Sequence, residues 1–161
     1  MKVNGKDLTS IWYDEKEDRI NIIDQTILPY NIKIRSLKTL NDSVLAIKNM
    51  LVRGAPLIGV TAAYGMYLAS KQDSSYENLL NAAQLLKSSR PTAINLKWAV
   101  DKIISEVKNI DNNRSKIILS LAYKIREEDI ISCSKIGDNG LHLLENIYKN
   151  KQSTVNILTH C

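Results

Sequence analysis

Two arginines beside expected helix starts are the residues best suited to bind an anion. Arg53 stands three residues before Pro56, and Arg90 directly precedes Pro91. Because proline has a fixed φ and no amide hydrogen, it suits the first turn of a helix. A guanidinium next to the positive end of a helix is a natural phosphate site. The same spacing also fits two ordinary helix starts with exposed arginines, and the residues alone leave both interpretations open.

A thiol at the carboxyl end of an expected strand is the second chemical feature. Residues 154–159 form an apolar run typical of a buried strand, and His160 and Cys161 follow it. Folds of the α/β class place catalytic residues at strand carboxyl ends, where a tuned thiol can act as acid, base or nucleophile. His160 would point to the opposite side from Cys161. The alternative is a buried, inert cysteine, which is our interpretation of Cys133.

The elements that would position these residues change from strands to helices along the chain. Residues rich in β-formers predict strands over 10–14, 19–24 and 30–34. Apolar periodicity predicts helices over 41–52, 57–70, 76–87, 91–108, 115–134 and 141–150, with a break at Gly137–Gly140. The final strand has no partner strand nearby, although a strand needs a sheet. The order therefore predicts an α+β domain over 1–150 and, over 151–161, the first strand of a second, truncated domain.

Composition restricts the class of protein. The 161 residues suit one domain or one domain with the start of another, and 44% are hydrophobic. The net charge of +5 comes from lysines spread along the chain without aromatic interleaving, which argues against nucleic-acid binding. No apolar run is long enough to span a membrane, and no secretory signal core is present. Two cysteines do not make a metal-site spacing. We expect a cytoplasmic protein that binds no metal, nucleic acid or membrane.

Five sequence blocks, which lie in order along the chain, carry a family resemblance. They are Asp-Gln-Thr-Ile-Leu-Pro at 24–29, Val-Arg-Gly-Ala-Pro-Leu-Ile-Gly-Val at 52–60 with Ala-Ala-Tyr-Gly at 62–65, Arg-Pro-Thr-Ala-Ile-Asn-Leu at 90–96 with Trp-Ala-Val at 98–100, Gly-Asp-Asn-Gly at 137–140, and Ile-Leu-Thr-His-Cys at 157–161. Together they resemble the methylthioribose-1-phosphate isomerase family. The resemblance runs from about residue 5 to the last residue.

The resemblance implies a fold, a reaction and a set of site residues. Family members have an N-terminal domain of short strands and a helical bundle, then a Rossmann-like α/β domain, with the active site between them. They convert 5-methylthioribose 1-phosphate to methylthioribulose 1-phosphate in methionine salvage, without metal or organic cofactor, and are commonly homodimers. By analogy Arg53, Gly54 and Ala55 hold the substrate's phosphate, Arg90 contributes to binding, and Cys161 is catalytic.

One departure from the family pattern affects the expected activity. The family's general-acid aspartate, a substrate-binding glutamine and an asparagine–lysine pair follow its catalytic cysteine, whereas this sequence ends at Cys161. We therefore expect the chain alone to be inactive. Two alternatives stay open: a sister isomerase acting on ribose 1,5-bisphosphate or 5-deoxyribose 1-phosphate, and a non-catalytic protein-binding module related to the regulatory subunits of the translation-initiation exchange factor.

Overall fold

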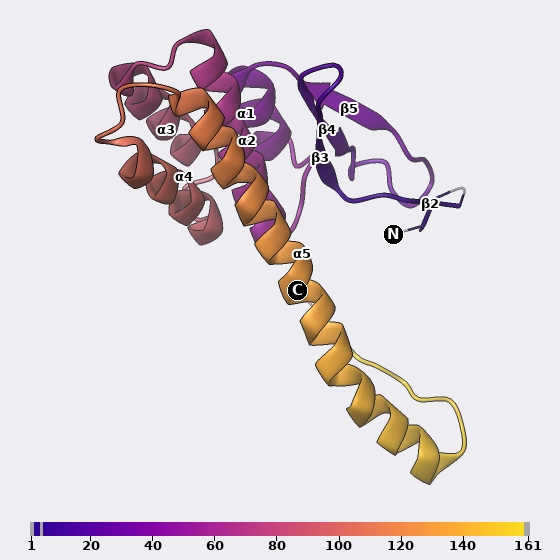
Figure 1. Ribbon diagram of the computed structural model, residues 1–161. Coiled ribbons are helices and arrows are strands. Elements are labelled where there is room, and N and C mark those ends of the chain that lie inside the picture. Colours follow the sequence, from indigo (N-terminus) through magenta and orange to yellow (C-terminus); the bar gives the residue numbers. More distant parts are fainter. Residues whose placement is uncertain (1, 4, 160–161) are drawn as a thin grey trace. The chain divides into compact units, whose positions relative to one another are not determined.

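The computed structural model describes residues 2–3 and 5–159 and confirms the predicted α+β class (Figure 1). The strands are β1 (Lys2–Val3), β2 (Lys6–Asp7), β3 (Ile11–Asp14), β4 (Arg19–Ile23) and β5 (Ile34–Leu37). The helices are α1 (Leu40–Lys48), α2 (Ala55–Gln72), α3 (Tyr76–Ser89), α4 (Ile94–Val107) and α5 (Arg114–Lys151). The chain divides into two compact units, the first ending at Arg126 and the second beginning at Glu127.

The strands form two small antiparallel sheets, β1–β2 and β3–β4–β5. The third predicted strand lies further along the chain than 30–34, because Ile34 is the first residue of β5 to pair with β4, opposite Ile23. Residues 28–33 form the connection instead, and the Lys33 carbonyl accepts a hydrogen bond from the Asp24 amide at 2.9 Å. The alternation within β4 turns Ile20 and Ile22 toward the helices, where both are fully buried.

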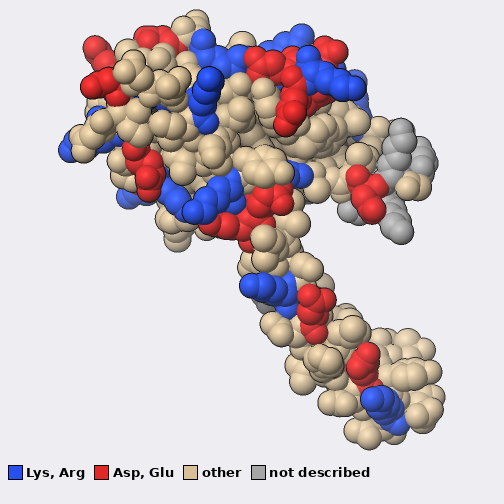
Figure 2. Space-filling view, viewed as in Figure 1, with Lys and Arg blue, Asp and Glu red and all other residues tan. Residues whose placement is uncertain are grey.

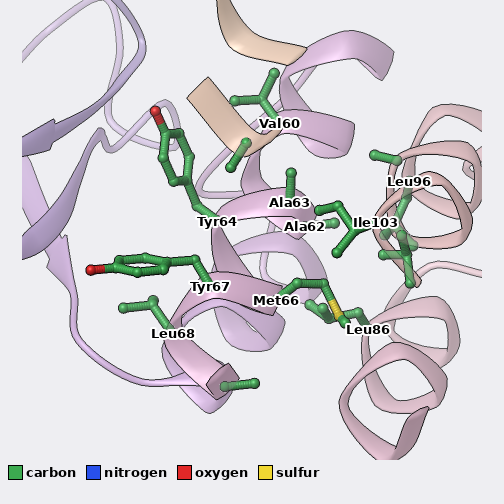
Figure 3. Packing of buried hydrophobic residues seen from close by; sticks show 14 of the residues in the cluster. Val60, Ala62, Ala63, Tyr64, Met66, Tyr67, Leu68, Leu86, Leu96 and Ile103 are labelled. Carbon is green, nitrogen blue, oxygen red and sulfur yellow. The ribbon is translucent and has the colours of Figure 1, made fainter. Parts of the chain in front are cut away.

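Helix α2 is the centre of the first unit, and every residue from Ile58 to Ser70 is buried. This agrees with the prediction from sequence, because a helix that is apolar all round should be surrounded by other elements. Figure 3 shows its side chains packed against those of α3 and α4, including Leu86 and Ile103. Small residues allow this close packing: a Cβ built on Gly65 would lie 3.0 Å from Ser43 Cβ and 3.1 Å from Leu86 Cδ2.

A polar cluster joins the β3–β4 hairpin to α2. Asp18 accepts hydrogen bonds at 2.9 Å from the hydroxyls of Tyr13 and Tyr67, and it forms an ion pair with Lys71 Nζ at 2.5 Å. The Lys71 ammonium is the main cause that lowers the pKa of Asp18, while burial raises the pKa of Tyr67. The two tyrosine rings meet edge to face, with centroids 5.8 Å apart. The hairpin is therefore fixed to the helix by both charge and ring packing.

Helix α5 corrects the prediction of two helices separated by a break at Gly137–Gly140. The helix is continuous through both glycines. Each glycine costs a helix about 1 kcal/mol relative to alanine. Ending the helix there would instead leave four carbonyls without helical partners, and strong helix formers continue the pattern through Leu144.

The predicted strand over 154–159 is also wrong, because these residues have no regular secondary structure. Ile157 and Leu158 are exposed rather than buried. A strand needs a neighbour to satisfy its amides and carbonyls, and no strand within residues 2–3 and 5–159 pairs with this segment. The second domain over 151–161 stays a prediction.

Candidate functional site

The start of α2 has the backbone geometry expected of an anion site. Gly54 is the N-cap residue, with φ 97° and ψ 130°, and its carbonyl accepts the Ile58 amide at 3.0 Å. A side chain at this positive φ would be strained, so the position favours glycine. Within the described residues no side chain caps this end, and Arg53 and Ala55 are exposed. The first-turn amides and the helix dipole therefore face solvent beside a guanidinium.

The start of α4 lies against α2. A Cβ built on Gly59 would lie only 2.9 Å from the backbone carbonyl oxygen of Asn95, so the second turn of α2 touches the first turn of α4. The predicted start at Pro91 is wrong: the helix begins at Ile94, because the turn before it is closed by the Ala93 amide bonding the Arg90 carbonyl at 3.0 Å. Two helix starts without side-chain caps are thus neighbours in the part of the chain that the structure describes.

The two predicted phosphate-binding arginines lie on these two neighbouring segments. Arg53 directly precedes the cap of α2, and the half-buried Arg90 follows the last residue of α3 and precedes the turn into α4. The contact between Gly59 and Asn95 fixes the two segments relative to each other. The two arginines therefore lie on segments that precede helices in contact with each other at Gly59 and Asn95.

A buried carboxylate supports the loop before α2. Asp24 is 1% exposed, and it accepts bonds from the Thr26 hydroxyl at 2.6 Å, the Thr26 amide at 3.1 Å and Arg35 Nε at 3.1 Å. The bond from the Thr26 hydroxyl is the main cause that lowers the pKa of Asp24. The next residue, Gln25, donates its amide to the Leu51 carbonyl at 2.9 Å. The sequence block at 24–29 therefore has a visible structural role, which is to hold the segment that carries Arg53.

Replacing Asp24 with asparagine should remove about 2 kcal/mol of unfolding free energy at pH 7, because its buried donors lose a charged acceptor. The folded-state pKa is lowered, so the carboxylate's contribution is complete above the unfolded pKa of about 4 and is lost as pH falls through the folded value. Urea unfolding at pH 7 and pH 3 measures the loss of unfolding free energy and its dependence on pH. The gap between wild type and variant should shrink at pH 3, and the exposed Glu106→Gln should show little loss at pH 7. An equal gap at both pH values would contradict this explanation.

An exposed apolar pair follows the start of α4. Ile94 is 80% exposed and Trp98, one turn later, is 49% exposed, with Lys102 Nζ 4.9 Å from the centre of the indole ring. They line a shallow cleft of about 620 Å³ together with Lys97 and Asp101. The sequence analysis did not single out Ile94, because an isoleucine in a helical pattern is normally a core residue.

The distribution of charge and the grouping of possible metal-binding side chains further describe the surface around the site. On the face seen in Figure 2, basic and acidic side chains are interspersed rather than separated. Within residues 2–3 and 5–159, no three His, Cys, Asp or Glu side chains are grouped so that they could hold a metal ion. None of the described helices is long and apolar enough to cross a bilayer. The predicted catalytic residue Cys161, and His160 before it, lie outside the described residues.

Comparison with known proteins gives one family and several relatives. The model of the "Initiation factor 2 subunit family" matches residues 51–161. A methylthioribose-1-phosphate isomerase of Methylorubrum extorquens is 42% identical over the whole chain, and one of Methylocella silvestris is 44% identical. This chain covers 44% and 45% of those two proteins, so it spans less than half the length of the curated relatives it matches.

Two solved structures resemble the chain closely. The eIF-2B delta subunit from A. fulgidus has a TM-score of 0.69 at 34% identity, covering 77% of this chain and 38% of that one. The 5-methylthioribose 1-phosphate isomerase from Pyrococcus horikoshii has a TM-score of 0.65 at 33% identity, covering 74% of this chain and 36% of that one.

Proposed function

Because this chain belongs to the initiation factor 2 subunit family, we propose that it supplies the N-terminal part of a methylthioribose-1-phosphate isomerase. The reaction converts 5-methylthioribose 1-phosphate to methylthioribulose 1-phosphate in methionine salvage. The observation that carries the proposal is an identity of about 42% to proteins of that name, extending over the whole chain. The substrate is a small phosphorylated sugar, and the complete enzyme is proposed to be a homodimer.

The substrate's phosphate is proposed to bind at the start of α2. Arg53 supplies a planar donor pair, and Gly54 and Ala55 bring backbone amides and the helix dipole close to the anion. Arg90, on the neighbouring segment before α4, supplies a second positive charge. The uncapped start of α2 supports this role, because its amides need an external acceptor.

Cys161 is proposed to handle the proton that moves between C1 and C2 of the opened sugar. The bond between C1 and the ring oxygen breaks, and that oxygen takes a proton to become a hydroxyl. A hydrogen is lost from C2 and one is gained at C1, which keeps its phosphate ester, while the C2 hydroxyl gives up its proton and becomes the ketone. A thiol near its pKa can take or give such a proton. Apolar surroundings would exclude water from this step. No step of this scheme needs a metal or an organic cofactor.

The relatives are more than twice as long as this chain, so we propose that the chain alone does not turn over substrate. The test compares the purified chain with a chimera in which it replaces the matching part of the Methylocella silvestris relative, which is 44% identical. The chimera should form methylthioribulose 1-phosphate and the chain alone should not. Turnover by the chain alone would contradict the inactivity, and a folded chimera without turnover would contradict the isomerase assignment.

The sister reactions and the binding-module alternative are tested in the same assay. Ribose 1,5-bisphosphate and 5-deoxyribose 1-phosphate are offered separately, and the substrate with the highest kcat/KM identifies the reaction. The similarity to the A. fulgidus eIF-2B delta subunit, at TM-score 0.69, keeps a non-catalytic module as the second candidate. That candidate is favoured if the folded chimera turns over none of the three sugars.

A further inference from the structure

Arg35, on β5, joins the sheet to the turn that follows β4. Its Nε donates a hydrogen bond at 3.1 Å to the carboxylate of Asp24, which is 1% exposed, while the arginine side chain itself is 47% exposed. Burying a carboxylate is costly unless a positive charge and hydrogen-bond donors compensate it. Arg35 is a positive partner that allows Asp24 to be buried, and the ion pair holds the residue directly after β4 against β5.

Asp24 in turn shapes the short turn in which Gln25 lies. Thr26 donates its hydroxyl, at 2.6 Å, and its amide, at 3.1 Å, to the same carboxylate oxygen of Asp24. Residues 24–26, which we call the Asp24 turn, are closed by these bonds as in an Asx turn, with Gln25 at the centre. The direction in which the Gln25 amide points therefore depends on how Asp24 is held.

The Gln25 amide holds the segment that leads to Arg53. It donates to the Leu51 carbonyl at 2.9 Å, and the Leu51 amide donates to the Ala46 carbonyl of α1, also at 2.9 Å. Leu51 is thus bonded to α1 through its amide and to the Asp24 turn through its carbonyl. A shift of the Asp24 turn would move Leu51, and with it Arg53 two residues later.

A cleft beside β5 gives a second observation that connects Arg35 with this segment. Arg35 and Leu51 line the same cleft, of about 370 Å³, together with Asn49, which is the C-cap residue of α1. Residues 49–51 therefore lie beside β5, although they follow it by more than ten positions in the sequence. Arg35 is a neighbour of the segment before Arg53 and is also bonded to the turn that holds this segment.

We propose that Arg35 is a positioning residue for the substrate's phosphate. It acts through the Asp24 turn and Leu51 on the place of Arg53, and it does not touch the substrate. A binding site is well defined only when further hydrogen bonds lock the residues that form it. The inference rests on the proposed function, because it takes the start of α2 as the phosphate site. A phosphate far from the reacting bonds is held equally in the ground and transition states, so lost positioning should raise KM and leave kcat nearly unchanged.

Arg35→Gln in the isomerase chimera tests the proposal by steady-state kinetics. KM for 5-methylthioribose 1-phosphate should rise about tenfold, which is the size expected when a hydrogen bond to a charged group is lost. The value of kcat should stay within about twofold of wild type. Arg35→Lys keeps the positive charge, so its KM should stay within about threefold. An unchanged KM in Arg35→Gln would overturn the proposal.

Arg126→Gln is the matched control for this experiment. Arg126 also donates a hydrogen bond from Nε to a residue far along the chain, the Ile11 carbonyl at 2.8 Å, but it lies on α5 and not beside the segment before Arg53. Its replacement should leave KM unchanged, and circular dichroism shows whether each variant is folded. An equal rise of KM in Arg126→Gln would mean that any loosened contact has this effect, and the proposal would fail.

A double-mutant cycle separates positioning through Asp24 from direct contact between Arg35 and the phosphate. Asp24→Asn should also raise KM about tenfold. The double variant, with Arg35→Gln added, should again lie about tenfold above wild type, since both changes break the same link. A rise of about a hundredfold in the double variant would show that the two residues act independently, and the proposed route through Asp24 would be wrong.

Inorganic phosphate, titrated calorimetrically into the folded chimera, gives a measurement that needs no turnover. Arg35→Gln should raise the dissociation constant of phosphate about tenfold, and Arg126→Gln should leave it unchanged. That result in a chimera that turns over no sugar would support the positioning role while it contradicts the isomerase assignment. A folded wild-type chimera that binds no phosphate, or an active one in which Arg35→Gln changes neither KM nor this dissociation constant, would overturn the proposal.

Discussion

Serine in place of Cys161 is expected to lower kcat of the isomerase chimera about a thousandfold, because the residue is proposed to transfer the proton at the reacting carbon. A serine hydroxyl titrates far above neutral pH, so it cannot take or give a proton as a thiol can. The phosphate contacts proposed for Arg53 would be unchanged, and KM should therefore change little. Steady-state kinetics with 5-methylthioribose 1-phosphate measure both constants.

The second cysteine of the chain is the matched control for this experiment. The interpretation of Cys133 as a buried residue is wrong, because Cys133 is exposed on α5, where its thiol lies 3.9 Å from an oxygen of Asp129 in the same helix. Cys133→Ser should leave kcat within about twofold of wild type, as is usual for an exposed residue without a catalytic role. If Cys161→Ser retained more than a tenth of wild-type kcat, Cys161 would not be the proton-transferring group.

Much of the first unit could be predicted from the sequence, because its elements carry strong local signals. The segment 57–70 is apolar on all sides and preceded by Pro56, and the structure extends this helix only to Ala55–Gln72. Strand β4 lies within the predicted range 19–24 because β-branched residues fill it. The pair β1–β2 was not predicted, because strands of two residues are too short to show an alternating pattern.

Two predictions were wrong, the helix break within α5 and the strand after it, because these structures depend on what surrounds a segment rather than on its composition. Asn139 and Gly140 usually form a turn, yet here the helix on both sides of them is strong enough to continue. The apolar run after Lys151 has the composition of a strand, but a strand forms only where a neighbour supplies hydrogen bonds. No local pattern reports whether that neighbour is present.

In the candidate site, too, features set by adjacent residues could be predicted from the sequence, whereas contacts between residues far apart in the sequence could not. The position of Arg53 beside a helix start follows from Gly54 and Pro56 alone, and the structure agrees. The bond between Asp24 and Arg35 joins residues eleven positions apart across a loop, and no pattern in the sequence predicts it. No local sequence pattern predicts the contact of Gly59 with Asn95 either, although it joins the two helices next to the proposed phosphate-binding residues.

Replacing Gly59 with valine should lower the free energy of unfolding by about 3 kcal/mol, because the new side chain has no space. Its Cβ alone would lie 2.9 Å from the Asn95 carbonyl oxygen and 3.2 Å from the carbonyl carbon. These are backbone atoms of the first turn of α4, so they cannot move aside as a flexible side chain would. Urea unfolding monitored by circular dichroism measures the loss.

Gly137→Val is the control, because a Cβ at Gly137 meets no atom within 4 Å and the substitution should change stability by less than about 1 kcal/mol. If both variants lost the same amount, the cost would come from valine in a helix and not from the contact between α2 and α4.

The contact also has a functional consequence in the chimera. A displaced α4 would move Arg90 away from the start of α2, so Gly59→Val should raise KM in the fraction that stays folded. A changed kcat with an unchanged KM would instead show that the contact between the two helices does not position the phosphate site.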